Sequence, residues 1–305
     1  DFYLYLYLYL YLYLYLDLSL IMIINFILIV VLFILLFIYA MWRGSRLPKY
    51  HPNNYFSDAK DNRQVIVCCG DSITHGRIGY DWFSDLHKKD RSRIYINAGI
   101  NGDLAWNLYT RIEDIISCNP DIITILIGTN DAMGSQSEEM GEDYIKRKGL
   151  PRIPSIDWYE ENYELIINSL SDKTNAKIYL ITLPWIGELE NEEIIEIVKS
   201  HNKVIKSLGK KYNLEVIELF KEMHKTINES KSQELKRKPV GYYMVNFKRF
   251  YRIARAVFMY YIFGISWNKI GEKYGLVTTC DFIHLNEYSG VILSELIRDH
   301  LKIIR

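Results

Sequence analysis

The sequence predicts an α/β protein in which helices cover both faces of a mostly parallel sheet. Short β-branched runs alternate with longer segments of helical periodicity after residue 64, and this alternation is typical of βαβ units. Polar clusters follow the first three runs, where open parallel sheets place their ligand sites. Upstream, residues 18–42 are almost entirely apolar and carry no charge. We therefore expect an N-terminal transmembrane helix ahead of the folded domain.

Composition limits the class of protein. The chain has 305 residues, of which 49% are hydrophobic and 24% are charged, enough for one α/β core with an appendage. Lys and Arg together number 37, as do Asp and Glu, so the net charge gives no reason to expect nucleic acid as a partner. The cysteines show neither metal-binding nor disulfide spacing and are expected to be buried free thiols: Cys68, Cys69, Cys118 and Cys280.

The chain begins with a low-complexity tract, residues 1–17. From residue 3 to residue 16 it consists of Tyr-Leu pairs, with no charge and no turn residue. A period of two is typical of β-aggregating or membrane-buried segments rather than of a folded domain. We assign no function to this tract.

Residues 18–42 predict a single transmembrane helix. At about 1.5 Å per residue such a helix reaches roughly 37 Å, more than the hydrocarbon core of about 30 Å. The alternative is a signal-peptide core, but such cores are usually about 7–15 residues long and follow basic residues, which are absent here. Arg43, Arg46 and Lys49 follow the span, so the positive-inside rule places the domain on the cytoplasmic side.

The rest of the chain divides into a linker, residues 43–63, and one domain, residues 64–305. The linker is polar and contains two prolines, which is typical of connecting segments. Within the domain, the predicted strands are residues 65–69, 94–97, 122–127, 177–183 and 215–219. The predicted helices are residues 81–89, 104–116, 158–171 and 192–212.

The stretch CCGDSITHG, residues 68–76, places Ser72 directly after the first predicted strand. The nucleophile elbow of many serine hydrolases reads G-x-S-x-G, but Thr74 stands where the last glycine would be. A nucleophilic Ser72 must therefore obtain its base and its oxyanion donors from elsewhere. Three other polar segments are available: NAGINGD at residues 97–103, GTND at residues 128–131 and DFIHLN at residues 281–286.

These four segments, in this order, resemble the SGNH hydrolase superfamily of GDSL lipases and esterases, from about residue 65 to the C-terminus. The resemblance implies a flavodoxin-like three-layer α/β/α sandwich with a central parallel sheet of about five strands. It also implies that Ser72 is the nucleophile, that Gly102 and Asn130 belong to the oxyanion hole, and that Asp281 and His284 complete a catalytic triad. Members of the family hydrolyse carboxylic esters, thioesters, lysophospholipids or sugar acetates, and some transfer acyl groups.

The chemistry of these residues agrees with the resemblance. If the first three strands lie in the order 2-1-3, the loops after them are neighbours and their polar side chains converge. His284 then takes the Ser72 hydroxyl proton while Asp281 holds the imidazole tautomer. The backbone N–H groups of Ser72 and Gly102, with the Asn130 amide, donate to the developing oxyanion. The reaction needs neither a metal nor another cofactor.

Several nearby polar residues have structural interpretations. Ser72 itself could cap the helix that follows it, and we expect Asp71 to hydrogen-bond to the local backbone. Asp131 is predicted to brace the turn after the third strand. His75 is expected to support the nucleophile or to lie at the surface. The remaining histidines have no companion ligands at metal spacing and are predicted to be surface residues: His51, His87, His201, His224 and His300.

A long segment separates the last predicted strand from Asp281, which predicts a helical insertion at about residues 225–279. Its first part, residues 228–239, is polar and is expected to form an exposed loop. Residues 246–263 have helical periodicity, with Lys248, Arg252 and Arg255 on one face. Two interpretations are open: a basic amphipathic helix that lies on an anionic membrane, or a helix packed on the core with a solvated basic face.

The sequence thus predicts a membrane-anchored serine hydrolase that cleaves carboxylic esters, of a lipid or another acyl compound, through an acyl-enzyme. Its expected partners are the acyl-ester substrate and the membrane, with no nucleic acid. One alternative is an O-acyltransferase with the same triad. The other is a non-catalytic binding protein on the same fold, although the complete set of motif residues argues against it. The acyl chain, the leaving group and the oligomeric state stay open.

Overall fold

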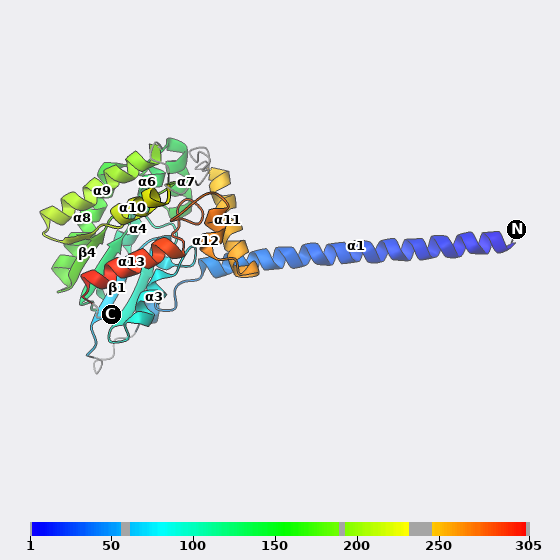
Figure 1. Cartoon of the computed structure of the whole chain (residues 1–305), viewed down its shortest axis with the longest axis horizontal. Coiled ribbons are helices and arrows are strands. Elements are labelled where there is room, and N and C mark those ends of the chain that lie inside the picture. The colour runs from blue at the N-terminus through cyan, green and yellow to red at the C-terminus, as the bar shows by residue number, and fades with distance from the viewer. Residues whose placement is uncertain (1, 56–61, 189–192, 232–245, 303–305) are drawn as a thin grey trace.

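The computed structural model describes residues 2–55, 62–188, 193–231 and 246–302. A five-stranded parallel sheet in the order β2-β1-β3-β4-β5 forms the centre of the domain (Figure 1), which confirms the predicted α/β class and strand number. The strands begin where the sequence predicts and end within two residues of the predicted ends: β1 (Val65–Gly70), β2 (Ile94–Gly99), β3 (Ile122–Leu126), β4 (Lys177–Ile181) and β5 (Glu215–Ile217).

Helices cover both faces of this sheet, as predicted. One face carries α3 (Trp82–Lys89), α10 (Leu219–Lys231) and α13 (Glu287–His300), and α13 contacts both of the others. The other carries α4 (Ala105–Thr110), α5 (Ile112–Ile116), α8 (Ile156–Lys173) and α9 (Glu193–Lys211). The predicted helix over residues 104–116 is therefore two helices. Other helices of the domain are α2 (Ser72–His75), α6 (Thr129–Gly134), α7 (Glu138–Lys148), α12 (Trp267–Glu272) and the 3₁₀ helix η1 (Pro52–Asn54).

The order of the first three strands brings their polar ends together. β1 lies between β2 and β3, and Gly70 at its end pairs with Gly99 on one side and Leu126 on the other. All three strands run parallel, so the loops that follow them leave the same edge of the sheet. The GDS, NGD and GTND segments therefore meet there.

The central strands β1 and β3 are buried because helices cover both faces, which explains why they read as continuous apolar runs. Every residue of β1 is buried. The four cysteines are free and buried, as predicted. Burial raises the pKa of Cys68 to about 12, so this thiol stays protonated and behaves as a small core residue.

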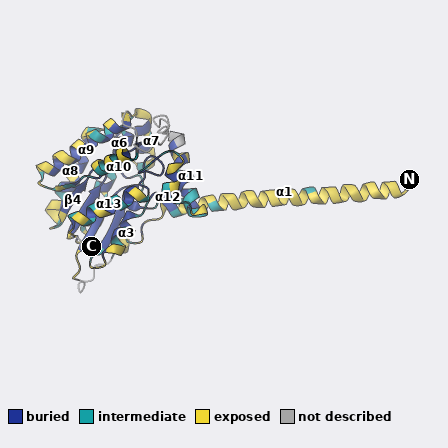
Figure 2. Ribbon diagram, in the orientation of Figure 1, coloured by how far each residue is buried: buried dark blue, intermediate teal, exposed yellow. Residues whose placement is uncertain are grey.

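The N-terminal helix α1 (Phe2–Ser45) extends away from the domain (Figure 1). It is continuous through both the Tyr-Leu tract and the predicted span. Because Tyr and Leu alternate, the helix formed by the tract presents these residues on every side. Figure 2 shows that nearly all of it is exposed. Among the described residues, α1 is the helix whose length and composition suit a membrane span, and an anchor and a signal sequence share these features.

The last turns of α1 pack on the domain, against α11 (Asn246–Phe263). Ala40 and Gly44 are buried. The Asn101 side chain donates to the Gly44 carbonyl at 2.9 Å. A Cβ atom on Gly44 would lie 3.2 Å from the Val257 side chain, so glycine permits this close approach.

The first part of the segment predicted as a linker also lies against the domain. His51 and Pro52 are buried, and the Asn97 backbone N–H donates to the Tyr50 carbonyl at 2.8 Å. Residues 43–55 therefore join α1 to the edge of the sheet beside β2. Residues 56–61 lie outside the described part of the chain.

The segment predicted as an insertion contains most of α10, then α11 and α12. The predicted helix over residues 246–263 coincides with α11. Residues 228–231 of the predicted exposed loop continue α10 instead, and the rest of that loop lies outside the described residues.

The basic residues predicted on one face of α11 do not share one solvated face. Arg252 is 4% exposed, and its guanidinium lies 4.3 Å from the centre of the Phe282 ring, a favourable cation–π arrangement. Arg255 donates to the Tyr274 hydroxyl at 3.0 Å. Both interpretations are therefore wrong for Arg252, because its side chain reaches neither a membrane surface nor solvent, whereas Arg255 is half-exposed. The Lys248 side chain lies outside the described set.

Candidate active site

Ser72 is positioned by a tight connection between β1 and α2. Asp71 caps α2, because its carboxylate accepts from the Ile73 backbone N–H at 2.9 Å. Local backbone bonding by Asp71 is thus confirmed, and Ser72 is the first residue of the helix rather than its cap. A Cβ atom on Gly70 would lie 2.4 Å from the Leu126 carbonyl oxygen, so only glycine lets the β1 end approach β3 this closely.

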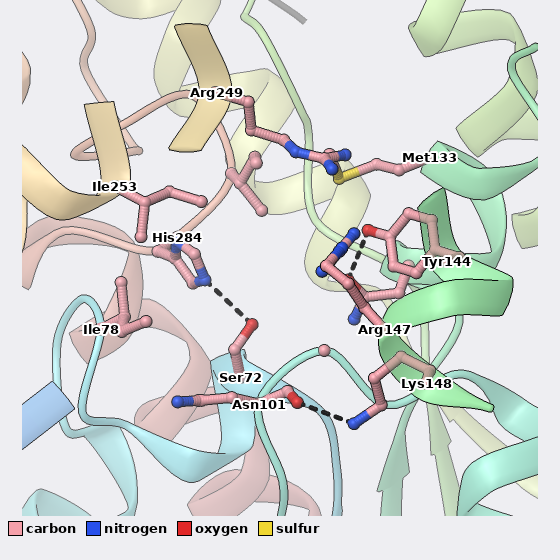
Figure 3. A pocket seen from close by; sticks show the side chains of 13 residues that line it. Ser72, Ile78, Asn101, Met133, Tyr144, Arg147, Lys148, Arg249, Ile253 and His284 are labelled. Carbon is pink, nitrogen blue, oxygen red and sulfur yellow. Dashed lines mark hydrogen bonds between the residues drawn. The ribbon is translucent and has the colours of Figure 1, made fainter. Parts of the chain in front are cut away.

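Ser72, His284 and Asp281 form a continuous chain of contacts. Ser72 Oγ lies 2.9 Å from His284 Nε2 (Figure 3). His284 Nδ1 lies 2.7 Å from Asp281 Oδ2. With the imidazole proton on Nδ1, the imidazole donates to Asp281 and its Nε2 accepts from the Ser72 hydroxyl. The structure therefore brings together three residues that are up to 212 positions apart in the sequence.

Asp281 is held as a carboxylate. Its burial opposes ionisation, but the nearby His284 and hydrogen bonds from His284 and from the backbone outweigh that effect and lower the Asp281 pKa. The second oxygen, Oδ1, accepts from the backbone N–H groups of Ile283 and His284 at 3.1 and 2.9 Å. This turn fixes the carboxylate plane, and through it the imidazole orientation.

The predicted oxyanion donors lie beside Ser72. Gly102 and Asn130 line the same pocket. Gly102 has a φ of +75°, a left-handed conformation that favours glycine. The Asn130 amide nitrogen donates to the Asp103 carbonyl at 3.0 Å, and its oxygen accepts from the Tyr144 hydroxyl at 2.8 Å. The same nitrogen donates a longer bond to Asp71 Oδ2 at 3.4 Å. These three bonds set the orientation of the Asn130 amide.

The loop after β2 is held by ion pairs around Asp103. Arg111 Nε lies 2.9 Å from one carboxylate oxygen of Asp103, and Lys148 Nζ lies 2.7 Å from the other. Arg111 also donates to the Ala98 carbonyl at 2.8 Å, and Lys148 to that of Asn101 at 3.0 Å. The backbone N–H of Gly102 is thus carried by a rigid loop.

Asp131 also supports this loop. Its carboxyl oxygens accept from the Ala105 backbone N–H at 3.1 and 3.2 Å, so it connects α6, just after β3, to the start of α4. Burial raises the Asp131 pKa to about 8. Asp131 thus has a structural contact, as expected, but the contact braces the start of α4.

The pocket over Ser72 has a volume of about 470 Å³, within the range of about 300–1,000 Å³ typical of ligand pockets. Its walls include residues that the sequence analysis missed: Ile78, Met133, Tyr144, Arg147, Lys148, Arg249 and Ile253. Figure 3 shows Tyr144, Arg147 and Lys148 across the pocket from His284. Five of the seven come from α7 and α11, which carry no motif, whereas Ile78 follows α2 and Met133 lies in α6. The basic end of α7 reads in the sequence as an ordinary helix C-terminus.

The prediction that five other histidines are surface residues is wrong for His51 and His201, which are buried. His201 packs against the Tyr159 ring and its Nδ1 lies 2.8 Å from the Ile197 carbonyl. Burial lowers the His201 pKa to about 4, so it is neutral and tolerated in the core. His75 is buried too, which excludes the surface alternative for it. Among the described residues, no cluster of His, Cys, Asp or Glu is suited to hold a metal.

Tyr144 is expected to position Asn130 through its hydroxyl. In a Tyr144→Phe variant the amide oxygen loses its bond from the Tyr144 hydroxyl, and a neutral hydrogen bond contributes about 0.5–1.5 kcal/mol. We expect kcat for a soluble ester to fall about two- to tenfold, with KM nearly unchanged. Steady-state kinetics would show this, with the half-buried Tyr109→Phe as a matched control. An unchanged kcat would contradict the positioning role.

Comparisons with known proteins agree with the site. The GDSL-like lipase/acylhydrolase family model matches residues 68–236, more than half of the chain. This match includes Ser72, Gly102 and Asn130, whereas Asp281 and His284 lie beyond it. No curated protein sequence is a significant match.

Solved structures share the fold. An acetyl xylan esterase, AlAXEase, is 20% identical over 79% of this chain and 100% of its own, with a TM-score of 0.56. An acetylxylan esterase from Geobacillus stearothermophilus is 16% identical over 79% and 95%, with a TM-score of 0.54. A lipase/acylhydrolase from Enterococcus faecalis is 23% identical over 78% and 95%, with a TM-score of 0.50.

At these identities the structural matches establish the fold, and the family model establishes the family. The motif segments that it covers are those that meet beside β1 and carry Ser72 and Asn130. The chain therefore belongs to the GDSL-like lipase/acylhydrolase family and is a GDSL-family carboxylic ester hydrolase.

Proposed function

We propose that this protein is a membrane-anchored serine hydrolase that cleaves acyl esters with Ser72 as nucleophile. In this proposal His284 is the general base and Asp281 is the carboxylate that orients it. The observation that carries the proposal is the pair of contacts at 2.9 and 2.7 Å that links Ser72 Oγ, His284 and Asp281 Oδ2. The serine also lines an open pocket that a substrate can enter.

The reaction follows from this geometry in two halves. Ser72 Oγ attacks the ester carbonyl carbon while His284 Nε2 takes the hydroxyl proton. The imidazolium then protonates the leaving alcohol oxygen, the C–O bond breaks, and an acyl-enzyme remains. A water molecule attacks the acyl carbon with His284 again as base. The carboxylic acid leaves, and the proton returns to Ser72. Asp281 stabilises the imidazolium in both halves.

Three donors would stabilise the oxyanion of each tetrahedral intermediate. They are the backbone N–H groups of Ser72 and Gly102 and the side-chain amide of Asn130. The amide nitrogen donates to the Asp103 carbonyl at 3.0 Å and to Asp71 Oδ2 at a longer 3.4 Å. In this proposal the hydrogen of the longer bond serves the substrate oxygen instead. Donors of this kind each contribute about 10²–10³-fold in rate.

The proposal that α1 is a retained membrane anchor, rather than a removed signal sequence, is supported by its packing. Removal of α1 would leave the Asn101 amide without the Gly44 carbonyl and would expose the Val257 side chain. The outward part of α1 is exposed and mostly apolar, and it carries no charge between residues 18 and 42. Such a helix is stable when lipid surrounds it.

We further propose that the domain faces the cytoplasm, because Arg43 and Arg46 follow the span directly. Protease protection in sealed vesicles tests this orientation. Digestion of the domain from the cytoplasmic side supports it, whereas protection until the lumenal side is opened contradicts it. Extraction with alkaline carbonate tests the anchor itself, because an integral protein stays in the membrane pellet.

Labelling with a fluorophosphonate probe tests the catalytic proposal, because the probe reacts with activated serines. We expect the full chain in detergent to be labelled, and Ser72→Ala to be unlabelled. Labelling of Ser72→Ala at the wild-type level would contradict the proposal. Product analysis in the presence of a long-chain alcohol then separates hydrolysis from acyl transfer, because a transferase would form a new ester instead of the free acid.

A further inference from the structure

A second pocket lies beside the catalytic one, between the last turns of α1 and α11. It is a groove of about 560 Å³ with mostly apolar walls. We call it the α1–α11 groove. Ile38 and Met41 of α1 form one wall, and Ile253, Ala254 and Val257 of α11 form the other. These walls offer a ligand apolar surface and few hydrogen bonds.

The groove is continuous with the catalytic pocket. Ile78, Asn101 and Ile253 line both cavities, so a chain in the groove can reach the serine without crossing the body of the protein. Figure 3 shows Ile78 and Ile253 on the side of Ser72 and His284 that faces away from the basic residues of α7. The groove therefore meets the catalytic pocket at its apolar side.

The α1 wall is part of the tertiary structure. The rings of Phe37 and Phe258 lie with their centres 6.1 Å apart. The Tyr261 hydroxyl of α11 donates to the Arg77 carbonyl at 2.9 Å, and this bond ties α11 to the loop after α2. The Asn101 side chain also donates to the Gly44 carbonyl of α1. Together these contacts fix the positions of both groove walls relative to Ser72.

The opposite side of the catalytic pocket is basic. Arg147 and Arg249 share the carboxylate of Asp143, at 2.5 and 2.9 Å, so two cations face one anion. Across the pair of cavities the surroundings thus change from apolar beside α1 to positively charged beside α7. An amphiphile matches this gradient, with its apolar chain toward α1 and its polar part toward α7.

We propose that the α1–α11 groove holds the alkyl chain of a membrane-resident ester, so that the membrane helix forms part of the substrate site. The inference rests on the proposed function of Ser72. Upstream of the groove, α1 is uncovered and apolar, so the outer end of the groove lies where the helix enters the lipid. Tyr39 and Trp42, which are typical of the membrane interface, mark this level. A chain can then pass from the bilayer into the groove sideways.

The test compares chain-length preference in full-length variants in phosphatidylcholine vesicles. Met41→Trp and Ile38→Trp add bulk to the α1 wall, and neither residue lines the catalytic pocket. Leu35→Trp, an exposed position on the same helix outside the groove, is the matched control. One series varies the acyl chain, as p-nitrophenyl palmitate against p-nitrophenyl butyrate. A second varies the alcohol, as hexadecyl acetate against ethyl acetate.

We expect the groove variants to lower the ratio of long-chain to short-chain kcat/KM about tenfold or more in one of the two series. Loss of burial for two or more methylene groups is enough for this effect. The series whose ratio falls shows whether the groove holds the acyl chain or the alcohol chain of the ester. Short-chain hydrolysis should stay within about twofold of wild type, and Leu35→Trp should change neither ratio.

Unchanged ratios in both series, with normal short-chain hydrolysis, would overturn the groove proposal and leave the esterase proposal intact. A similar loss in Leu35→Trp would also overturn it, because the effect would then belong to the helix and not to the groove. Short-chain hydrolysis that survives Ser72→Ala would instead contradict the proposed function.

Discussion

Replacement of Ser72 by alanine is expected to lower kcat/KM for a soluble short-chain ester by about 10⁴-fold or more. The variant lacks the oxygen that attacks the carbonyl, and only the oxyanion donors and binding contacts are left to accelerate attack by water. The measurement is hydrolysis of p-nitrophenyl butyrate by full-length protein in detergent. Ser135→Ala, a half-buried serine outside the catalytic pocket, is a control that should retain full activity.

His284→Ala should lose a similar amount, and the Ser72→Ala/His284→Ala double variant should be little worse than either single variant. The two residues act in the same proton transfer, so their effects are not additive. Losses that multiply in the double variant would show that the two residues act independently. Circular dichroism and thermal unfolding must match wild type, because both side chains are buried.

Asp281→Asn is expected to lower kcat about 10³–10⁴-fold while KM changes little. The side-chain amide of the variant would donate to His284 Nδ1, so the imidazole proton would move to Nε2, which then cannot accept from the Ser72 hydroxyl. Steady-state kinetics against Asp157→Asn, an exposed aspartate in the first turn of α8, would isolate this effect from a change of charge. A variant that kept a tenth of the wild-type kcat would rule out the tautomer-holding role.

Much of the site was predictable because its motif residues lie at strand ends. The runs of β-branched and apolar residues mark β1, β2 and β3, and the chain must turn at Gly70, Gly99 and Gly128. In a parallel sheet covered on both faces, such ends are where polar side chains are exposed. A local pattern therefore indicated both the strands and the residues placed after them.

Other features were not predictable from local patterns. His201 reads as a polar residue on a helix, yet it is buried against Tyr159. Arg252 reads as part of a basic outer face, yet it lies over Phe282, which is 30 residues further along. In each case a distant partner decides whether a polar side chain can be buried, and helical periodicity says nothing about that partner.

The sequence by itself determined the α/β class, the apolar N-terminal helix and the residues of the proposed site, because periodicity and short motifs depend on neighbours along the chain. Only the tertiary structure decided what surrounds Ser72. It placed Tyr144 on Asn130, brought Arg249 to the pocket wall, and packed the end of α1 against α11 beside the nucleophile. These contacts join segments that are far apart in the chain, and they form only when close packing excludes every other arrangement.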